Sequence, residues 1–478
     1  MWKRIVIFGM ILCLVLGGDT WIVQAGKNSA QPAWTTGTED VEVLAPAPAE
    51  TKLYARAAVL MDAESGRVLY EKNGDEILPM ASTTKIMTCI IALENADLEE
   101  TVSISAYAAS MPKVKLYVKK GEEYRLGDLL YSLMLESHND VAVAIAEHIG
   151  KKYLPAQLQS KEVCEFTKEE SLQAVAAFAD LMNEKAYKLG CTNTWFITPN
   201  GLDATETFYS KGDGMDREIQ SSGDEGAELT RQHSTTAKEL AAIMSYCILY
   251  SPKKDAFLEI TRTPSYTVTS LDGRNSFCTN HNAFLNMMEG ALSGKTGFTN
   301  LAGYCYVGAV ERDGRTYVVA LLACGWPNNK SYKWSDTKIL MNYGIEEYFY
   351  REFGNGAQAL GLPDKVQVRN GQTPYIGQNA YVPVEVVESS DATGRPENFC
   401  ELFGNGLGML MRADEEVVVN YQMANVLEAP VYKGDIIGVI TYEVNGIIYK
   451  QEEIVITADV AEIDVKWCFE RVIDGFFY

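Results

Sequence analysis

The chain has 478 residues, of which 47% are hydrophobic and 22% are charged, which is the composition of a globular protein. Its formal net charge of −22 argues against nucleic acid as a partner, because phosphate binding needs clustered Lys and Arg. The four His residues lie far apart and none falls in a metal-binding pattern, so we expect no metal site and no other cofactor.

Residues 1–25 have the pattern of a secretory signal peptide. The basic residues Lys3 and Arg4 precede an apolar run, and a small-x-small cleavage site ends at Ala25. We expect cleavage there, because the apolar run is shorter than the roughly 20 residues that a spanning helix needs. An uncleaved anchor helix is the alternative. Residues 26–52 are rich in Pro, Ala and Thr and lack hydrophobic periodicity, which predicts a linker.

Residues 53–355 are predicted to form the first folded domain, with strands at both ends and helices between them. Two apolar runs around a Glu-Ser-Gly turn predict a β-hairpin over 55–70, and a helix is expected from about Ser82. Further helices are predicted over 126–135, 140–148, 171–189, 236–250 and 335–349, and strands over 290–296, 303–311 and 316–323. Hairpin joins between the last strands imply an antiparallel sheet with helices packed on it, an α/β (α+β) fold.

Residues 362–460 are predicted to form a separate C-terminal all-β domain. Short runs of alternating apolar and polar residues indicate strands. They occur at 381–387, 416–421, 436–442 and 446–449. Asn445-Gly446 between the last two is a strong signal for a two-residue hairpin turn.

Residues 463–478 are predicted to form an amphipathic tail helix. Its apolar side chains fall at the spacing of one helical stripe, which consists of Val465, Cys468, Phe469, Val472, Ile473 and Phe476. Charged residues occupy the other face. Such a helix is suited to the interface of a membrane, and the alternative is that the stripe packs against the β-domain.

Three short patterns carry the candidate chemistry: Ser-x-x-Lys at 82–85, Ser-His-Asn at 137–139 and Lys-Thr-Gly at 295–297. The first is weak alone, because chance matches also begin at Ser110 and Ser251. The order and spacing of all three together make the combination specific.

The first pattern suits nucleophilic catalysis. A serine hydroxyl needs a base beside it, and residues three apart on a helix share one face, so Lys85 can reach Ser82. Lys85 can act as a base only when neutral, and burial together with the charge of Lys295 would lower its pKa. The alternative is that Ser82 only caps the helix while Lys85 is solvated.

With these motifs the chain resembles the low-molecular-weight penicillin-binding proteins, which are serine-type D-alanyl-D-alanine carboxypeptidases of peptidase family S11. The resemblance covers roughly residues 55–348 and includes Pro199-Asn200-Gly201-Leu202-Asp203 and His233-Ser234-Thr235. It implies a β-lactamase/penicillin-binding-protein-like antiparallel sheet flanked by helices. A weaker likeness continues over 429–458 in the β-domain.

The resemblance also implies the reaction. Ser82 would attack the bond between two D-alanines of a peptidoglycan stem peptide, with Lys85 as the acylation base. Ser137 would relay a proton toward the leaving amine. The acyl-enzyme would be hydrolysed by water, and β-lactam antibiotics would act as covalent inhibitors. We expect an exported, extracytoplasmic enzyme held at the outer face of the cytoplasmic membrane.

Five further residues are implied to bind the substrate. Asn139 would bind the peptide backbone, and Lys295 and Thr296 would hold the terminal carboxylate. Gly297 would let the strand and the substrate approach closely, and the backbone N–H of Phe298 would be the second oxyanion donor beside that of Ser82.

Two other functions stay open at this point. A β-lactamase-like hydrolase would need a deacylating base, but no Glu-x-x-Leu-Asn motif lies between Ser137 and Lys295. A non-catalytic cell-wall-binding scaffold would keep the fold without the reaction. One departure from the family is the long acidic stretch at 204–232, which is either a flap near the cleft or a disordered insertion.

Overall fold

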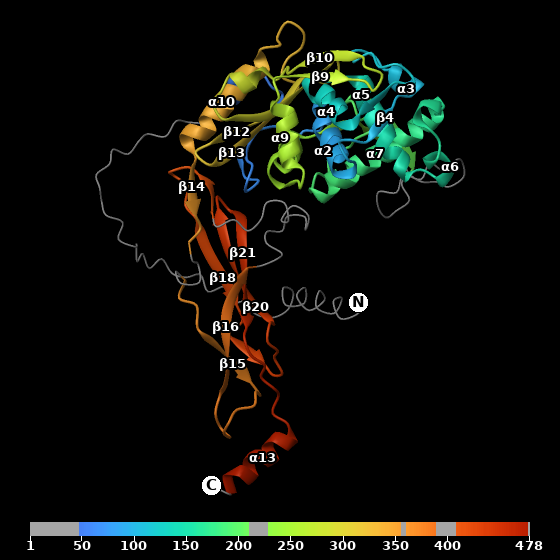
Figure 1. Ribbon diagram of the computed structural model, residues 1–478. Coiled ribbons are helices and arrows are strands. Elements are labelled where there is room, and N and C mark those ends of the chain that lie inside the picture. The colour runs from blue at the N-terminus through green and yellow to red at the C-terminus, as the bar shows by residue number, and fades with distance from the viewer. Residues whose placement is uncertain (1–46, 210–227, 355–359, 389–407, 477–478) are drawn as a thin grey trace.

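The computed structural model of the chain describes residues 47–209, 228–354, 360–388 and 408–476. The predicted signal peptide and most of the linker lie outside the described residues, as does most of the acidic stretch at 204–232. The described chain has two parts, a mixed part of helices and strands and a long β-part that leads to the tail helix (Figure 1). The predicted α/β (α+β) class with a separate C-terminal sheet domain is therefore confirmed.

A five-stranded antiparallel sheet in the order β11-β12-β13-β1-β2 forms the centre of the first part. Its strands are β1 (Ala57–Asp62), β2 (Val68–Lys72), β11 (Ala291–Thr299), β12 (Gly303–Arg312) and β13 (Arg315–Leu322). These positions confirm the predicted hairpin and the three predicted strands that follow the helices. Because β11 lies at the edge of the sheet, one side of its backbone is left for another partner.

Helices cover both faces of this sheet. Val59 on β1 packs into the core that contains Ile243 of α8 (Ala237–Ser245), whereas its neighbour Leu60 packs into the core that contains Leu340 of α10 (Tyr332–Glu347). Successive residues of a strand point to opposite faces, so the strand is buried along its whole length.

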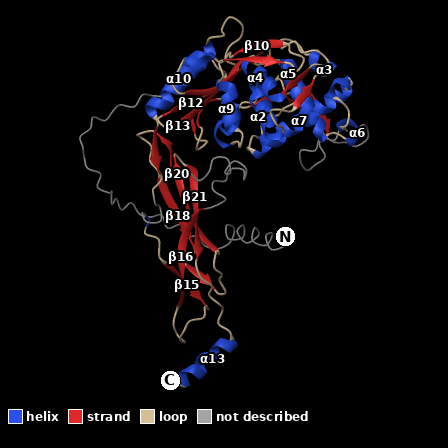
Figure 2. Ribbon diagram, viewed as in Figure 1, coloured by secondary structure: helices blue, strands red, loops and turns tan. Residues whose placement is uncertain are grey.

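The remaining helices form a lobe beside the sheet (Figure 2). They are α2 (Lys85–Asn95), α3 (Ala106–Ala109), α4 (Leu126–Leu135), α5 (Asn139–Gly150), α6 (Ala156–Gln159), α7 (Lys168–Lys188) and α9 (Lys254–Arg262). Short antiparallel pairs join them: β3 (Leu78–Pro79) with β8 (Ser234–Thr235), β4 (Thr101–Ser103) with β5 (Glu123–Arg125), β6 (Thr205–Tyr209) with β7 (Glu228–Gln232), and β9 (Ser265–Thr269) with β10 (Asn275–Thr279).

Three predicted helices need correction. Ser82 lies in a 3₁₀ turn, η2 (Ala81–Thr84), and the α-helix begins only at Lys85. The helix predicted over 236–250 ends at Ser245 and continues as a π-helical turn. The helix predicted over 335–349 ends earlier, because β14 (Phe349–Glu352) pairs with β17 (Gly408–Met411), a distant partner that local periodicity cannot reveal.

The C-terminal part is a six-stranded sheet in the order β18-β20-β21-β16-β15-β19. Its strands are β15 (Lys365–Arg369), β16 (Ala380–Glu388), β18 (Val418–Met423), β19 (Val426–Glu428), β20 (Ile436–Val444) and β21 (Ile447–Ile456). Asn445 and Gly446 both have positive φ, 53° and 78°, as the predicted hairpin turn requires. The helix α13 (Val465–Phe476) lies at the end of this part farthest from the five-stranded sheet (Figure 1).

A buried ion pair joins the two parts. The Arg67 guanidinium, from the turn between β1 and β2, pairs with Glu415 and donates a 2.6 Å hydrogen bond to the Leu410 carbonyl. The rings of Tyr348 and Tyr449 lie 5.7 and 5.6 Å from the guanidinium carbon. Charged, aromatic and backbone contacts thus meet at one side chain, which holds the β-domain against the sheet.

Candidate active site

Ser82 and Lys85 meet where the 3₁₀ turn η2 becomes α2. Lys85 Nζ lies 3.0 Å from Ser82 Oγ, 3.0 Å from Asn139 Oδ1 and 2.6 Å from the Asn200 carbonyl oxygen. None of these three partners is a carboxylate. Burial lowers the pKa of Lys85 well below its usual value, and the charge of Lys295 lowers it further. A neutral amine beside a serine hydroxyl can accept its proton.

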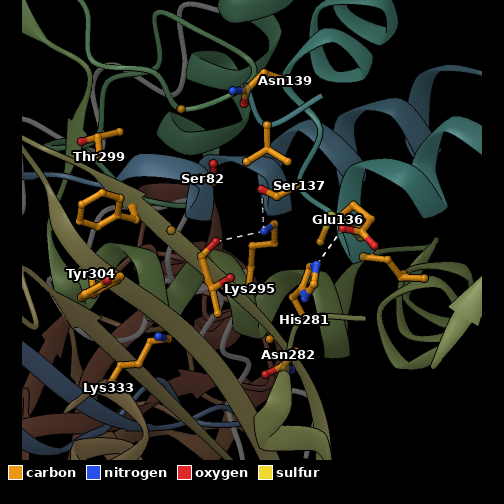
Figure 3. Close-up of a pocket in the computed structure, with 18 of the residues that line it drawn as sticks. Ser82, Glu136, Ser137, Asn139, His281, Asn282, Lys295, Thr299, Tyr304 and Lys333 are labelled. Carbon is orange, nitrogen blue, oxygen red and sulfur yellow. Dashed lines mark hydrogen bonds and ion pairs between the residues drawn. The ribbon is translucent and has the colours of Figure 1, made fainter. Parts of the chain in front are cut away.

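Ser137 and Lys295 form the second pair. Ser137 precedes α5 with a φ of +65°, an uncommon conformation for a residue that is not glycine. Lys295, from the edge strand β11, donates a 2.9 Å hydrogen bond to Ser137 Oγ. Burial lowers the pKa of Lys295 to about 7. The pair therefore links the helical lobe to the sheet across the site (Figure 3).

The Lys-Thr-Gly segment of β11 lies directly against η2. A Cβ atom at Gly297 would come within 2.9 Å of Ser82 N and 3.1 Å of the Met80 carbonyl oxygen, so a larger residue would push the strand away. The four residues from Lys295 to Phe298 all line the same cleft. This close approach brings β11 beside the backbone of Ser82.

Asn139, the first residue of α5, stands between Lys85 and a neighbouring loop. Its Oδ1 accepts from Lys85, and its Nδ2 donates to the carbonyl oxygen of Lys113 at 3.2 Å. The position was predicted to bind a peptide backbone. Its amide group also orients the Lys85 amine toward Ser82.

These residues surround one cleft of about 430 Å³. Seven of the eight residues singled out in the sequence line it, namely Ser82, Ser137, Asn139, Lys295, Thr296, Gly297 and Phe298. Lys85 is fully buried behind Ser82. The structure thus brings together side chains that lie more than two hundred residues apart in the chain. In the part of the chain that is described, no group of three or more His, Cys, Asp or Glu side chains is arranged to hold a metal ion.

Several residues at this cleft were not assigned a part from the sequence. The Asn200 carbonyl accepts from Lys85, and a Cβ at the next residue, Gly201, would lie 2.0 Å from the Ala81 carbonyl oxygen. The Pro-Asn-Gly sequence at these positions is part of the family resemblance, but it predicted no function for Asn200 or Gly201. Lys333 of α10 also lines the cleft, and burial lowers its pKa to about 8. No motif marks Lys333, because only the fold brings α10 to this place.

Two buried His residues lie near the site, and neither is among the residues that line the cleft. His233 Nε2 lies 2.8 Å from Thr84 Oγ1, and its Nδ1 accepts from the Ile197 N–H. Burial lowers the pKa of His233 to about 3, so the ring is neutral. His138 Nδ1 lies 2.7 Å from Ser132 Oγ, and burial lowers the pKa of His138 to about 4.

The chain is similar to several known proteins. A family model described as D-alanyl-D-alanine carboxypeptidase matches residues 43–153 and 173–323. The D-alanyl-D-alanine carboxypeptidase DacF of Bacillus subtilis (strain 168) is 24% identical over 411 residues, which cover 85% of this chain and 86% of that protein. A D-alanyl-D-alanine endopeptidase of Pseudomonas aeruginosa is 29% identical over 264 residues, 54% of this chain and 68% of that protein. A solved D-alanyl-D-alanine carboxypeptidase from Mycobacterium tuberculosis H37Rv has 27% sequence identity and a TM-score of 0.48, over 64% of this chain and 94% of that one.

Proposed function

This chain belongs to the D-alanyl-D-alanine carboxypeptidase family, and we propose that Ser82 is the nucleophile of its reaction and Lys85 the base. The protein is a serine-type D-alanyl-D-alanine carboxypeptidase, a penicillin-binding hydrolase of the cell wall. One observation carries the assignment of the two residues: a buried amine, Lys85 Nζ, lies 3.0 Å from Ser82 Oγ and has no carboxylate among its three hydrogen-bond partners.

The reaction follows from these contacts. Ser82 Oγ bonds to the carbonyl carbon of the penultimate D-alanine while Lys85 Nζ takes the hydroxyl proton. The amide C–N bond then breaks as the Ser137 hydroxyl, which accepts a hydrogen bond from Lys295, passes its proton to the departing nitrogen and takes in exchange the proton held by Lys85. Water finally attacks the ester, which releases the shortened peptide and restores the Ser82 hydroxyl.

Backbone donors stabilise the charge that develops on the carbonyl oxygen. The donors are the N–H groups of Ser82 and Phe298. The glycine at 297 supports this role, because it allows β11 to lie against the Ser82 backbone. Donors fixed by the fold need no reorganisation during the reaction, which is the usual basis of an oxyanion hole.

Cations select a substrate with a free terminal carboxylate. Lys295 and the hydroxyl of Thr296 bind this group, and Lys333 adds a further positive charge to the same cleft. A carboxylate would in turn stabilise the protonated forms of Lys295 and Lys333, whose pKa values burial lowers to about 7 and about 8.

Labelling with a fluorescent penicillin distinguishes the proposed function from its two rivals. A stable covalent label on the wild-type protein that is absent from Ser82→Ala supports the carboxypeptidase. A label that decays rapidly would favour a β-lactamase-like hydrolase, and a protein that takes no label and releases no D-alanine would be a scaffold.

We also propose that the protein is exported and held at the membrane by α13. Three residues of its apolar stripe, Val465, Phe469 and Val472, are exposed by 87%, 66% and 47%, which supports a membrane interface over packing against the β-domain. Such an uncovered stripe suits a lipid interface. No helix in the described ranges is both long and apolar enough to cross a membrane.

We propose domain boundaries as well. We assign residues 53–355 to the catalytic domain, 362–460 to the β-domain and 463–478 to the tail. The two sheets support this assignment. The last strand of the first sheet along the chain is β13, and the strands of the second sheet lie between β15 and β21. Limited proteolysis tests it, since the first cuts should fall between the two sheets.

A further inference from the structure

Glu136 and His281 form a hydrogen-bonded bridge among the residues that line the cleft. Glu136 follows α4 in the helical lobe, and His281 follows β10, in the segment that leads on to β11. His281 Nε2 lies 2.7 Å from Glu136 Oε2, and the Thr279 N–H donates to Glu136 Oε1 at 2.8 Å. The His281 N–H also donates to the Leu135 carbonyl oxygen at 3.2 Å. Three hydrogen bonds therefore join the end of α4 to the segment after β10 at this point.

The position of the bridge along the cleft indicates which part of a substrate would reach it. In Figure 3, Thr299 lies on one side of Lys295, whereas Glu136 and His281 lie on the other. The proposed function places the reacting carbonyl at Ser82 and the terminal carboxylate at Lys295 and Thr296. A chain that continued beyond the leaving D-alanine would therefore run toward Glu136 and His281, which line the same cleft.

We propose that the Glu136–His281 bridge limits the leaving group to a single amino acid. This inference rests on the proposed function and concerns the specificity of the same site. Release of D-alanine and cleavage of a cross-link between two stem peptides are the same amide hydrolysis, and they differ only in the size of the departing amine. A branched peptide on that amine would meet the bridge and would have to break its hydrogen bonds, whereas free D-alanine ends before it.

The chain offers a matched control for this proposal. His148 Nε2 lies 2.8 Å from Glu100 Oε2, the same kind of pair, on helix α5 and away from the residues that line the cleft. A change at His148 therefore removes an imidazole–carboxylate contact without opening the cleft.

The test compares two substrates on full-length mature protein. One is a stem peptide that ends in D-Ala-D-Ala, and the other is a dimer of stem peptides joined through the penultimate D-alanine. The ratio of kcat/KM for the dimer to kcat/KM for the single peptide is followed by liquid chromatography with mass spectrometry. His281→Ala should raise this ratio about tenfold, and His281→Gln, which keeps the bulk and a donor, should leave it near the wild-type value. His148→Ala should also match the wild type.

The proposal is overturned if the ratio for His281→Ala stays at the wild-type value, or if His281→Gln or His148→Ala raises it as much. Penicillin labelling of Ser82 checks that each variant is folded, and His281→Ser replaces His281→Ala if the latter takes no label. Failure of the proposed function looks different, because the wild-type protein itself would then take no label and release no D-alanine.

Discussion

Lys85 Nζ lies 3.0 Å from Ser82 Oγ in a place where the charge of Lys295 helps to lower the pKa of the Lys85 amine. The two lysines thus have different tasks within one cleft. The first must lose its proton to act as a base, and the second must keep its proton to bind a carboxylate.

The first prediction concerns the base. Lys85→Arg should lower the rate of penicillin acylation by roughly a thousandfold or more, because a guanidinium stays protonated and cannot take the Ser82 proton. Stopped-flow acylation measures the effect, and an unchanged melting temperature serves as the control. Acylation at a near-normal rate would mean that another group is the base.

The second prediction concerns pH. The value of kcat/KM for D-alanine release should rise with pH as Lys85 loses its proton, at a pH well below the usual lysine value. It should fall again as Lys295, whose pKa burial lowers to about 7, loses the charge that binds the substrate. Lys295→Arg keeps that charge, so it should move the falling limb to higher pH, where Lys333, whose pKa burial lowers to about 8, loses its proton. A falling limb that stays at the wild-type pH in this variant would assign it to a different group.

The third prediction concerns the terminal carboxylate. Amidating the C-terminus of the peptide should lower kcat/KM about a hundredfold, because the amide leaves buried cations without a partner. Lys333→Met should raise KM for the acid peptide several-fold, while Lys338→Met, an exposed position on the same helix, should not. Equal turnover of amide and acid would contradict the proposed role of the cations.

The fourth prediction concerns the joint between the two parts of the protein. Arg67→Met should lower the free energy of unfolding by about 3–5 kcal/mol, because it leaves the buried Glu415 carboxylate without its partner. The exposed pair of Arg56 and Glu76 is the matched control, and Arg56→Met should cost about 0–1 kcal/mol. Urea denaturation measures both changes, and equal losses would show that the buried pair adds nothing.

The fifth prediction concerns the tail. Deleting residues 464–478 should release active enzyme from membranes without lowering the melting temperature, because Val465, Phe469 and Val472 on the apolar stripe of α13 are exposed. Membrane fractionation followed by penicillin labelling provides the measurement. A full-length mature protein that stays in the soluble fraction, or a truncation that unfolds the β-domain, would speak against the anchor.

Much of the fold could be predicted from local patterns. The helix predicted over 126–135 is α4 with the same ends, and the Asn445-Gly446 turn connects β20 and β21. These features depend on periodicity and turn chemistry within a few residues. The change from helix to strand at Phe349 could not be predicted, because it depends on pairing with β17, far along the chain.

Only some residues of the site could be predicted from the sequence. Ser82, Ser137 and Lys295 belong to short motifs, so they were found before any geometry was known. Lys333 and the bridge from Glu136 to His281 have no motif, and they reach the cleft only through the packing of α10 and of the loop after β10. Tertiary structure supplies such residues, and patterns in a single sequence do not reveal them.

Peptide-mapping mass spectrometry tests whether Ser82 is the nucleophile that carries the acyl group. The mature protein is incubated with a peptide that ends in D-Ala-D-Ala and is quenched with acid, and both the released D-alanine and the acylated residue are identified. We predict free D-alanine together with an acyl group on the peptide that contains Ser82, and neither product with Ser82→Ala. An acyl group on Ser110 or Ser251, or D-alanine released by Ser82→Ala, would contradict the account.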